Sequence, residues 1–191
     1  MPDEPTVRTA RSVVNSLVND IKSRKGEPRL PTGLAELDNL IWGLHTREVQ
    51  VVAARPSMGK TSFAIQIAFH LASRGTKVLI ISLEMTNDQV MERALCSWCG
   101  ISGWDLRRGF VPTDFDEKVK GFNHIVENLD LFLVDDMGHS FEHIRSIFNS
   151  MEKANSRPEV VVIDYINLIS LEGFDDDRQA MKHYIRELRS F

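Results

Sequence analysis

The sequence predicts an α/β fold with a mostly parallel central sheet flanked by helices. Three observations predict this fold. Short apolar, β-branched runs alternate with longer segments of helical periodicity. A Gly-Lys-Thr turn at 59–61 joins the first run, which begins at Val49, to a helix. Acidic residues follow the later runs, at the edge where a parallel sheet places its ligand chemistry. The 191 residues are enough for one sizeable α/β core with an appendage.

An amphipathic helix is predicted near the N-terminus, from about Val7 to Lys25, after a disordered start at 1–5. Its apolar residues recur every three or four positions and form one stripe: Val7, Ala10, Val13, Val14, Leu17, Val18 and Ile21. Glycine and proline at 26–33 then separate this helix from the core. The stripe packs either on its own domain or on a neighbouring subunit, and the sequence leaves both alternatives open.

The next segment has the composition of a phosphate-binding loop. It reads Ala54, Arg55, Pro56, Ser57, Met58, Gly59, Lys60, Thr61 and Ser62. Such a loop points backbone N–H groups into a concavity at a helix N-terminus, with a lysine for the phosphates and a hydroxyl for Mg²⁺. Helical periodicity begins directly afterwards, and the preceding run is predicted to be a buried parallel strand. We therefore expect a nucleotide-binding site in which these nine residues contact the ligand.

One residue departs from the usual pattern of this loop. The common form is GxxxxGK[ST], and Ala54 stands where the first glycine is expected. Alanine adopts most backbone conformations that do not need a positive φ, so we interpret the loop as a variant of the motif.

A short helix at 34–40 leads into the first strand, and the helix after the loop is expected to end at Gly75. The run 77–83 predicts a second buried strand, and Glu84 closes it. A carboxylate at that edge of a sheet can face the γ-phosphate and polarise the attacking water. It can equally cap the helix that starts near Thr86, and the residues alone favour neither alternative.

Further elements are predicted as helices at 87–99, 101–109 and 114–128 and a strand at 129–134. Asp135 and Asp136 follow that strand, where they either contact a ligand or form the turn before Ser140, a predicted N-cap. His139 and His143 are four residues apart but lack the rest of a zinc motif. We expect them to be a surface pair.

The run 159–163 predicts a fourth buried strand, and Asp164 closes it. An apolar β-branched run followed by Asp is typical of a Walker B strand, whose carboxylate lies beside the phosphate-binding loop and orients Mg²⁺. An acidic loop at 173–177 and an amphipathic helix at 178–191 are expected to follow.

Charge and hydropathy exclude other classes of protein. The formal net charge is −4 and the pI is about 5.9, so the composition lacks the strongly basic footprint of a nucleic-acid-binding protein, although local basic loops or an assembled channel could still supply one. No apolar run is long enough to span a membrane, and no signal peptide is present. We expect a soluble cytoplasmic protein with no membrane partner. Cys96 and Cys99 lack the context of a redox pair or a zinc site, which favours two packed thiols.

Four motifs follow one another along the chain. They are Pro31-Thr32-Gly33 with Leu37-Asp38, ARPSMGKT at 54–61, SLEM at 82–85 with Met91 and Arg93 after it, and VVVIDYINLI at 160–169. Together they resemble the ATPase domain of the bacterial replicative DNA helicase, the DnaB type. The resemblance covers residues 6–191. The second and third motifs, in this order and spacing, are a far more specific signature of the family than a phosphate-binding loop alone.

The resemblance implies a RecA-like P-loop NTPase core in a homo-hexameric ring that assembles through the 7–25 linker helix. It implies ATP- and Mg²⁺-dependent translocation on single-stranded DNA, 5′ to 3′, with duplex unwinding, and a primase or a helicase loader as further partners. Lys60 would bind the phosphates, Thr61 and Asp164 the metal, and Glu84 would be the catalytic base. The implied domains are a linker helix and hinge at 1–30 and a partial RecA-like ATPase domain at 31–191.

The resemblance also indicates which parts of that family this chain lacks. These are later strands, a glutamine that senses the γ-phosphate, DNA-contacting loops, an arginine finger and an N-terminal helical domain. We therefore expect ATP binding with little hydrolysis and no unwinding by this chain alone, and marginal stability or self-association through an unpaired sheet edge. Two alternatives remain. One is another RecA-like ATPase of the recombinase or clock type, and the other is a non-catalytic module that binds nucleotide or helicase subunits.

Overall fold

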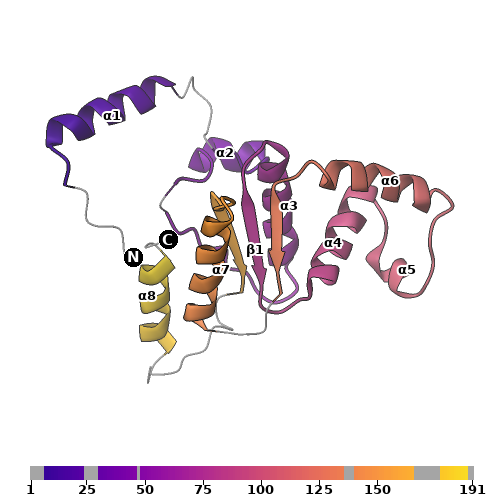
Figure 1. Cartoon of the computed structure of the whole chain (residues 1–191). Coiled ribbons are helices and arrows are strands. Elements are labelled where there is room, and N and C mark those ends of the chain that lie inside the picture. Colours follow the sequence, from indigo (N-terminus) through magenta and orange to yellow (C-terminus); the bar gives the residue numbers. More distant parts are fainter. Residues whose placement is uncertain (1–6, 24–29, 47, 136–139, 166–176, 189–191) are drawn as a thin grey trace. The chain divides into compact units, whose positions relative to one another are not determined.

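The computed structural model describes residues 7–23, 30–46, 48–135, 140–165 and 177–188. It divides the chain into two compact units, residues 1–45 and 46–191, and Figure 1 labels their helices and strand β1. Every helix in the described ranges falls short of the length and apolar content that a bilayer crossing requires. The predicted division into 1–30 and 31–191 stays a prediction.

The first unit contains helix α1 (Ala10–Ser23), which begins later than its apolar pattern predicts. The reason is a cap: Thr9 Oγ1 accepts a hydrogen bond of 3.2 Å from the backbone N–H of Ser12. The apolar stripe of α1 is confirmed as one face of a helix, and its side chains are exposed. They are Val13, Val14, Leu17, Val18 and Ile21.

A carboxylate organises the rest of this unit around helix α2 (Ala35–Ile41). Asp38 Oδ1 accepts hydrogen bonds of 2.8 Å from both the backbone N–H and the hydroxyl of Thr32. Asp38 Oδ2 accepts one of 3.2 Å from the N–H of Gly33. Thr32 is fully buried, so these bonds satisfy polar groups that water does not reach. The first quoted motif therefore has a structural role, since it fixes the turn before α2.

The second unit is built on a parallel sheet of three described strands in the order β2-β1-β3. They are β1 (Val78–Ser82), β2 (Leu131–Val134) and β3 (Val160–Asp164). Strand β1 lies in the centre, with Ile81 opposite Val134 on one side and Ile163 on the other. All five of its residues are buried, which explains its continuous apolar sequence. The predicted parallel α/β architecture is confirmed.

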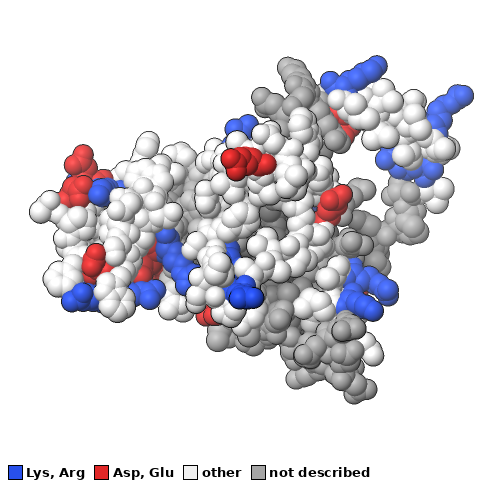
Figure 2. Space-filling view, turned by 180° about the vertical axis from the view of Figure 1, so that it is seen from behind, with Lys and Arg blue, Asp and Glu red and all other residues white. Residues whose placement is uncertain are grey.

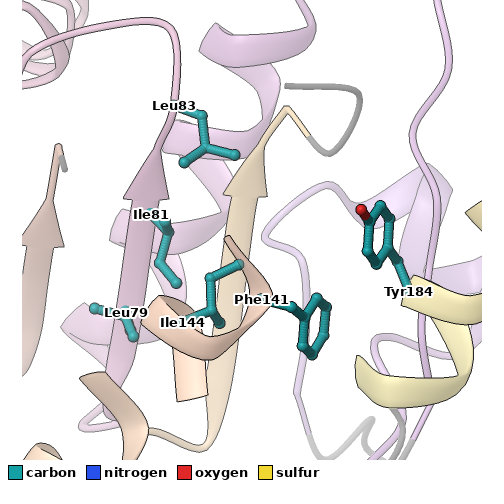
Figure 3. Close-up of a cluster of buried hydrophobic side chains, with 6 residues drawn as sticks. All are labelled: Leu79, Ile81, Leu83, Phe141, Ile144 and Tyr184. Atoms are coloured by element: carbon teal, nitrogen blue, oxygen red, sulfur yellow. The ribbon is translucent and has the colours of Figure 1, made fainter. Parts of the chain in front are cut away.

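Helices cover both faces of this sheet (Figure 1). They are α3 (Lys60–Ser73), α4 (Asn87–Cys99), α5 (Gly103–Arg107), α6 (Phe115–Val126), α7 (Phe141–Lys153) and α8 (Asp177–Leu188). Leu79 and Ile81 of β1 and Leu83 directly after it form one buried cluster (Figure 3). The cluster also contains Phe141 and Ile144 of α7 and Tyr184 of α8. Helix α3 packs against all three strands. The predicted 173–177 loop lies outside the described residues, except for its last residue, which begins α8.

Aromatic side chains join α4 and α6 to α3. The ring of Phe122 on α6 stacks on Phe69 of α3 at a centroid distance of 6.1 Å. It also contacts Trp98 of α4 at 5.9 Å with a tilt of 50°. Such pairs add to the free energy gained from burial alone. The helical segments between β1 and β2 are thereby fixed to α3, the helix that follows the predicted phosphate-binding loop.

The prediction of a strand from Val49 into the loop is wrong. Residues 48–55 have no strand assignment, and the side chains of Val51 and Val52 are 70% and 53% exposed. A strand needs a neighbouring strand for its backbone hydrogen bonds, and in the described part of the sheet only β2 and β3 pair with β1. The β-branched residues of this segment favour an extended backbone, but a strand also needs a neighbouring strand to pair with.

Candidate nucleotide-binding site

The loop before α3 is a tight turn that contains two residues with left-handed backbone. The N–H of Met58 donates a hydrogen bond of 3.3 Å to the carbonyl oxygen of Arg55, and Ser57 and Gly59 have φ of 64° and 87°. Left-handed conformations between helical ones turn successive N–H groups toward one concavity. A Cβ at Gly59 would meet nothing within 4 Å, so its positive φ, and not space, explains the glycine.

The loop also shows why alanine is tolerated at its start. The described residues other than glycine with a positive φ are Trp42, Ser57 and Asn155. Ala54 is not one of them, so the expected glycine has no conformational task at that position. The left-handed residue is Ser57 instead, which the sequence motif did not identify.

The N-terminus of α3 faces the exposed loop. Gly59 is the N-cap, and its carbonyl oxygen accepts the first helical hydrogen bond of 2.9 Å, from the N–H of Phe63. The first turn of α3 contains no acidic side chain, so its positive end is available to an anion. Ser62 lies in this turn and is exposed, while Lys60 and Thr61 are half-buried.

A direct contact joins the two predicted metal-binding residues. The Thr61 hydroxyl donates a hydrogen bond of 2.6 Å to Asp164 Oδ2, across 103 positions of sequence. Thr61 is in the first turn of α3, and Asp164 is the last residue of β3. The parallel sheet brings them together, because β3 ends beside the segment that follows β1: the N–H of Leu83 donates to the carbonyl oxygen of Asp164 at 2.7 Å.

A second contact at the same edge joins the residue before Thr61 to the residue after Asp164. The ammonium of Lys60 lies 5.4 Å from the centroid of the Tyr165 ring. This distance is within the range of a cation–π interaction. Tyr165 belongs to a quoted motif, yet sequence reasoning gave it no role. The signal was its position directly after the Walker B aspartate.

Glu84 lies on a short segment that is anchored on both sides. It is exposed and follows β1 at the carboxyl edge of the sheet, as predicted. The N–H of Met85 donates to Ser82 Oγ at 3.2 Å, and Ser82 is buried. The N–H of Asn87 donates to Asp135 Oδ2 at 2.8 Å. The alternative that Glu84 caps α4 is wrong, because Thr86 and Gln89 form a reciprocal capping box there.

Asp135 therefore has a structural contact that sequence reasoning left open. Its carboxylate accepts a hydrogen bond from the backbone N–H of Asn87, the first residue of α4. It also lies near the positive end of that helix, and both interactions stabilise its negative charge. Asp136 and His139 lie outside the described residues. Ser140 is confirmed as an N-cap, since its hydroxyl accepts a bond of 3.2 Å from the N–H of His143.

The donor set fits a hydrated magnesium ion. Mg²⁺ prefers hard oxygen ligands, keeps several waters, and is held by one or two protein groups together with substrate phosphates. A threonine hydroxyl and an aspartate carboxylate in contact match that requirement. In the part of the chain that the structure describes, no cluster of three or more His, Cys, Asp or Glu residues forms a separate metal site.

The two cysteines fit the prediction of packed thiols. Both are free, with Cys99 buried and Cys96 half-buried on α4. Burial raises the pKa of both thiols above the ordinary value, and the nearby Glu92 carboxylate adds to the effect at Cys96. A raised pKa keeps a thiol protonated at neutral pH, which disfavours metal binding and nucleophilic chemistry.

Residues 29–191 match the family described as the DnaB-like helicase C-terminal domain. The chain belongs to this family. Within it, the replicative DNA helicase DnaC of Bacillus subtilis (strain 168) is 33% identical over 177 residues, which are 91% of this chain and 39% of that protein. The replicative DNA helicase DnaB of Geobacillus stearothermophilus is 34% identical over 175 residues, or 89% of this chain and 38% of that protein. The chain thus spans less than half the length of these curated relatives.

Two solved structures share the fold of this chain. One is described as an ATPase domain and superposes with a TM-score of 0.80 and 27% identity, covering 96% of this chain and 69% of that one. A DnaB-like replicative helicase, described together with its interactions with primase, superposes with a TM-score of 0.79 and 27% identity, covering 95% and 47%. The RecA-like fold of this DnaB-like domain is thereby confirmed.

Proposed function

We propose that this chain is the phosphate-binding part of a replicative helicase motor, which couples ATP hydrolysis to translocation on single-stranded DNA and unwinding of the duplex. The observation that supports the proposal most directly is the 2.6 Å contact between Thr61 and Asp164. It brings together a hydroxyl from the phosphate-binding loop and a carboxylate from the Walker B strand, which are the two protein groups that such motors use at Mg²⁺.

Each site residue has a role in this proposal. Residues 54–62 form the loop around the phosphates of ATP, where all of them except Pro56 have a backbone N–H to donate, and Lys60 reaches the β- and γ-phosphates. Thr61 and Asp164 hold the metal, and Glu84 orients and deprotonates the attacking water. Mg²⁺, when bound, neutralises charge on the β- and γ-phosphates. The exposed position of Glu84 at the same sheet edge as Asp164 is compatible with its role.

We further propose that the chain alone binds ATP with little turnover. It covers less than half of its replicative relatives, and phosphoryl transfer in such motors depends on groups delivered from a neighbouring subunit. An arginine finger is worth about 10³ to 10⁵ in kcat. Binding needs only the loop, the helix N-terminus and the metal ligands, which all lie within the described residues.

The proposal of a ring assembly is based on the exposed apolar face of helix α1. Its five large exposed apolar side chains form one stripe on a helix with a polar opposite face, and such a stripe is suited to a groove on another protein. We propose that α1 docks on a neighbouring copy and that a homo-hexamer results. A primase or a helicase loader is the further proposed partner.

Single-stranded DNA is proposed as a ligand of the assembled ring. Figure 2 shows Lys and Arg side chains interspersed with Asp and Glu side chains on one face of the molecule, and the net charge of the chain is −4. Binding of single strands generally uses a positively charged groove. In this proposal the groove forms when several copies combine their basic residues around a channel.

The test is binding of a fluorescent ATP analogue to the 191-residue chain in the presence of Mg²⁺, with Lys60→Ala as the control. The proposal expects saturable binding by the wild type and loss of binding in the variant, because the ammonium is the main cation at the phosphates. Circular dichroism verifies that both proteins fold. A folded wild type that does not bind the analogue contradicts the proposal.

A further inference from the structure

The last residue of β3 and the residue directly after it meet the first two residues of α3. Asp164 contacts the Thr61 hydroxyl at 2.6 Å, and Tyr165 lies under the Lys60 ammonium at 5.4 Å. The first contact joins the proposed metal ligands. The second contact involves Lys60, which the proposed function assigns to the phosphates. The proposed function leaves the role of Tyr165 in this contact unexplained.

We infer that Tyr165 is a positioning residue that holds the Lys60 ammonium at the phosphate-binding loop, ready for the phosphates of a nucleoside triphosphate. The inference rests on the proposed function, because it concerns the same site. A free lysine side chain has four rotatable bonds and loses considerable entropy when it is fixed on a ligand. A ring that already orders the ammonium removes part of that loss from the binding step.

The chemistry of the partner matters. A carboxylate beside Lys60 would neutralise the ammonium and compete with phosphate for it. The first turn of α3 has no acidic residue, and no ion pair of Lys60 occurs among the described side chains. An aromatic face attracts a cation through its quadrupole without carrying a net charge. The lysine therefore keeps its full charge for the incoming phosphates.

The alternative effect has the opposite sign. A ring that holds Lys60 away from the phosphates would compete with the ligand, and its removal would tighten binding. The placement of both contacts at one sheet edge favours positioning, because the same junction of β3 and α3 that brings Asp164 to Thr61 also brings Tyr165 to Lys60. The sign of the change in affinity separates the two.

The experiment compares Tyr165→Phe and Tyr165→Leu in the 191-residue chain, using Mg²⁺ with ATPγS and with tripolyphosphate as probes. We expect the leucine variant to bind both probes about two- to fivefold more weakly, which corresponds to an exposed cation–π contact. The phenylalanine variant, which keeps the ring, should restore the affinity. An equal loss of affinity for both probes would show that the ring acts on binding of the phosphates, because the phosphate chain is what the two probes share.

A matched control exists elsewhere in the chain. The guanidinium of Arg108 lies 5.1 Å from the centroid of the Phe110 ring, a contact of the same kind on an exposed loop after α5. Phe110→Leu removes that contact and should leave nucleotide affinity unchanged. Lys60→Ala tests the proposed function in the same assay.

A second measurement does not depend on the leucine variant being folded. Phenylalanine and its mono-, di- and trifluorinated forms are placed at position 165, since fluorination weakens the quadrupole with little change of shape. Affinity should fall stepwise along the series. In the wild type, the Lys60 ε-methylene protons should show an upfield ring-current shift relative to those of an unstructured lysine.

The outcomes are distinct. Wild-type binding with no change in the leucine variant and a flat fluorination series overturns the inference and leaves the proposed function standing. Tighter binding by the leucine variant also overturns it. Absence of binding by the folded wild type overturns both the proposed function and the inference. The inference stands only if affinity falls with the loss of the ring and with its fluorination.

Discussion

Thr61 and Asp164 are joined by a hydrogen bond of 2.6 Å, although 103 positions of sequence separate them. The contact connects the start of α3 to the end of β3 and depends on the register of the parallel sheet, in which Asp164 lies opposite Ser82. A hydroxyl and a carboxylate in contact are already close to the arrangement in which both bind one hydrated cation.

Removing the hydroxyl tests this arrangement. In Thr61→Val the side-chain shape is kept, but Asp164 loses its donor and the metal loses a ligand. We expect Mg²⁺ to lose most of its effect on ATP affinity, and the free energy of unfolding to fall by about 1 kcal/mol. Titrations with and without Mg²⁺ measure the first effect, and urea denaturation measures the second. Thr61→Ser keeps the hydroxyl and should retain the Mg²⁺ dependence, and a valine variant that also retains it would refute the assignment.

Glu84 is tested by Glu84→Gln in an assembly that hydrolyses ATP. The amide cannot accept the proton of the attacking water, so kcat should fall by about 10² to 10⁴ while ATP is still bound. A coupled assay of phosphate release measures turnover. Glu127→Gln changes an exposed carboxylate after α6 and is the matched control. Turnover at the wild-type rate in the Glu84 variant would remove this residue from the mechanism.

Asp135 is expected to stabilise the start of α4. Asp135→Ala removes the acceptor for the Asn87 N–H, at 2.8 Å, and a negative charge at a helix N-terminus. We expect the free energy of unfolding to fall by about 1 to 2 kcal/mol in urea denaturation. Amide hydrogen exchange at Asn87 should also become faster. Asp130→Ala, the same change of charge at an exposed side chain before β2, should alter stability much less, and equal losses would contradict the explanation.

The apolar stripe of α1 is tested through assembly. Leu17→Asp puts a charge in the middle of the exposed stripe, whereas Asn15→Asp puts the same charge on the polar face of the helix. Light scattering should show that only the first substitution reduces association of the chain, because burying an unpaired charge is costly. Equal association of both variants would show that α1 does not form the interface.

The architecture and most of the site could be predicted from the sequence. The strands at 77–83, 129–134 and 159–163 and the helices around them were recognisable because burial on both faces leaves continuous apolar runs, and amphipathic helices leave a period of 3.6. The positions of Lys60, Thr61 and Asp164 were predictable because their motifs combine a residue type with a secondary-structure context.

What could not be predicted depends on contacts between distant segments. The strand from Val49 was expected from composition, but a strand exists only where another strand accepts its hydrogen bonds. The bond from Asn87 to Asp135 and the ring of Tyr165 under Lys60 join elements that the sequence does not order in space. The left-handed backbone of Ser57 was hidden because a serine carries no signal for it.

The central position of β1 has a consequence for the synthesis of the chain. Val78 pairs with Leu131 on one side and with Val160 on the other. At about 5 to 20 residues per second, a ribosome needs roughly 4 to 16 seconds to pass from Val78 to Val160. Throughout that interval the most buried strand of the described sheet has an open edge, to which a strand of another nascent chain can add. A chaperone that binds extended apolar segments is therefore needed most between the emergence of β1 and that of β3.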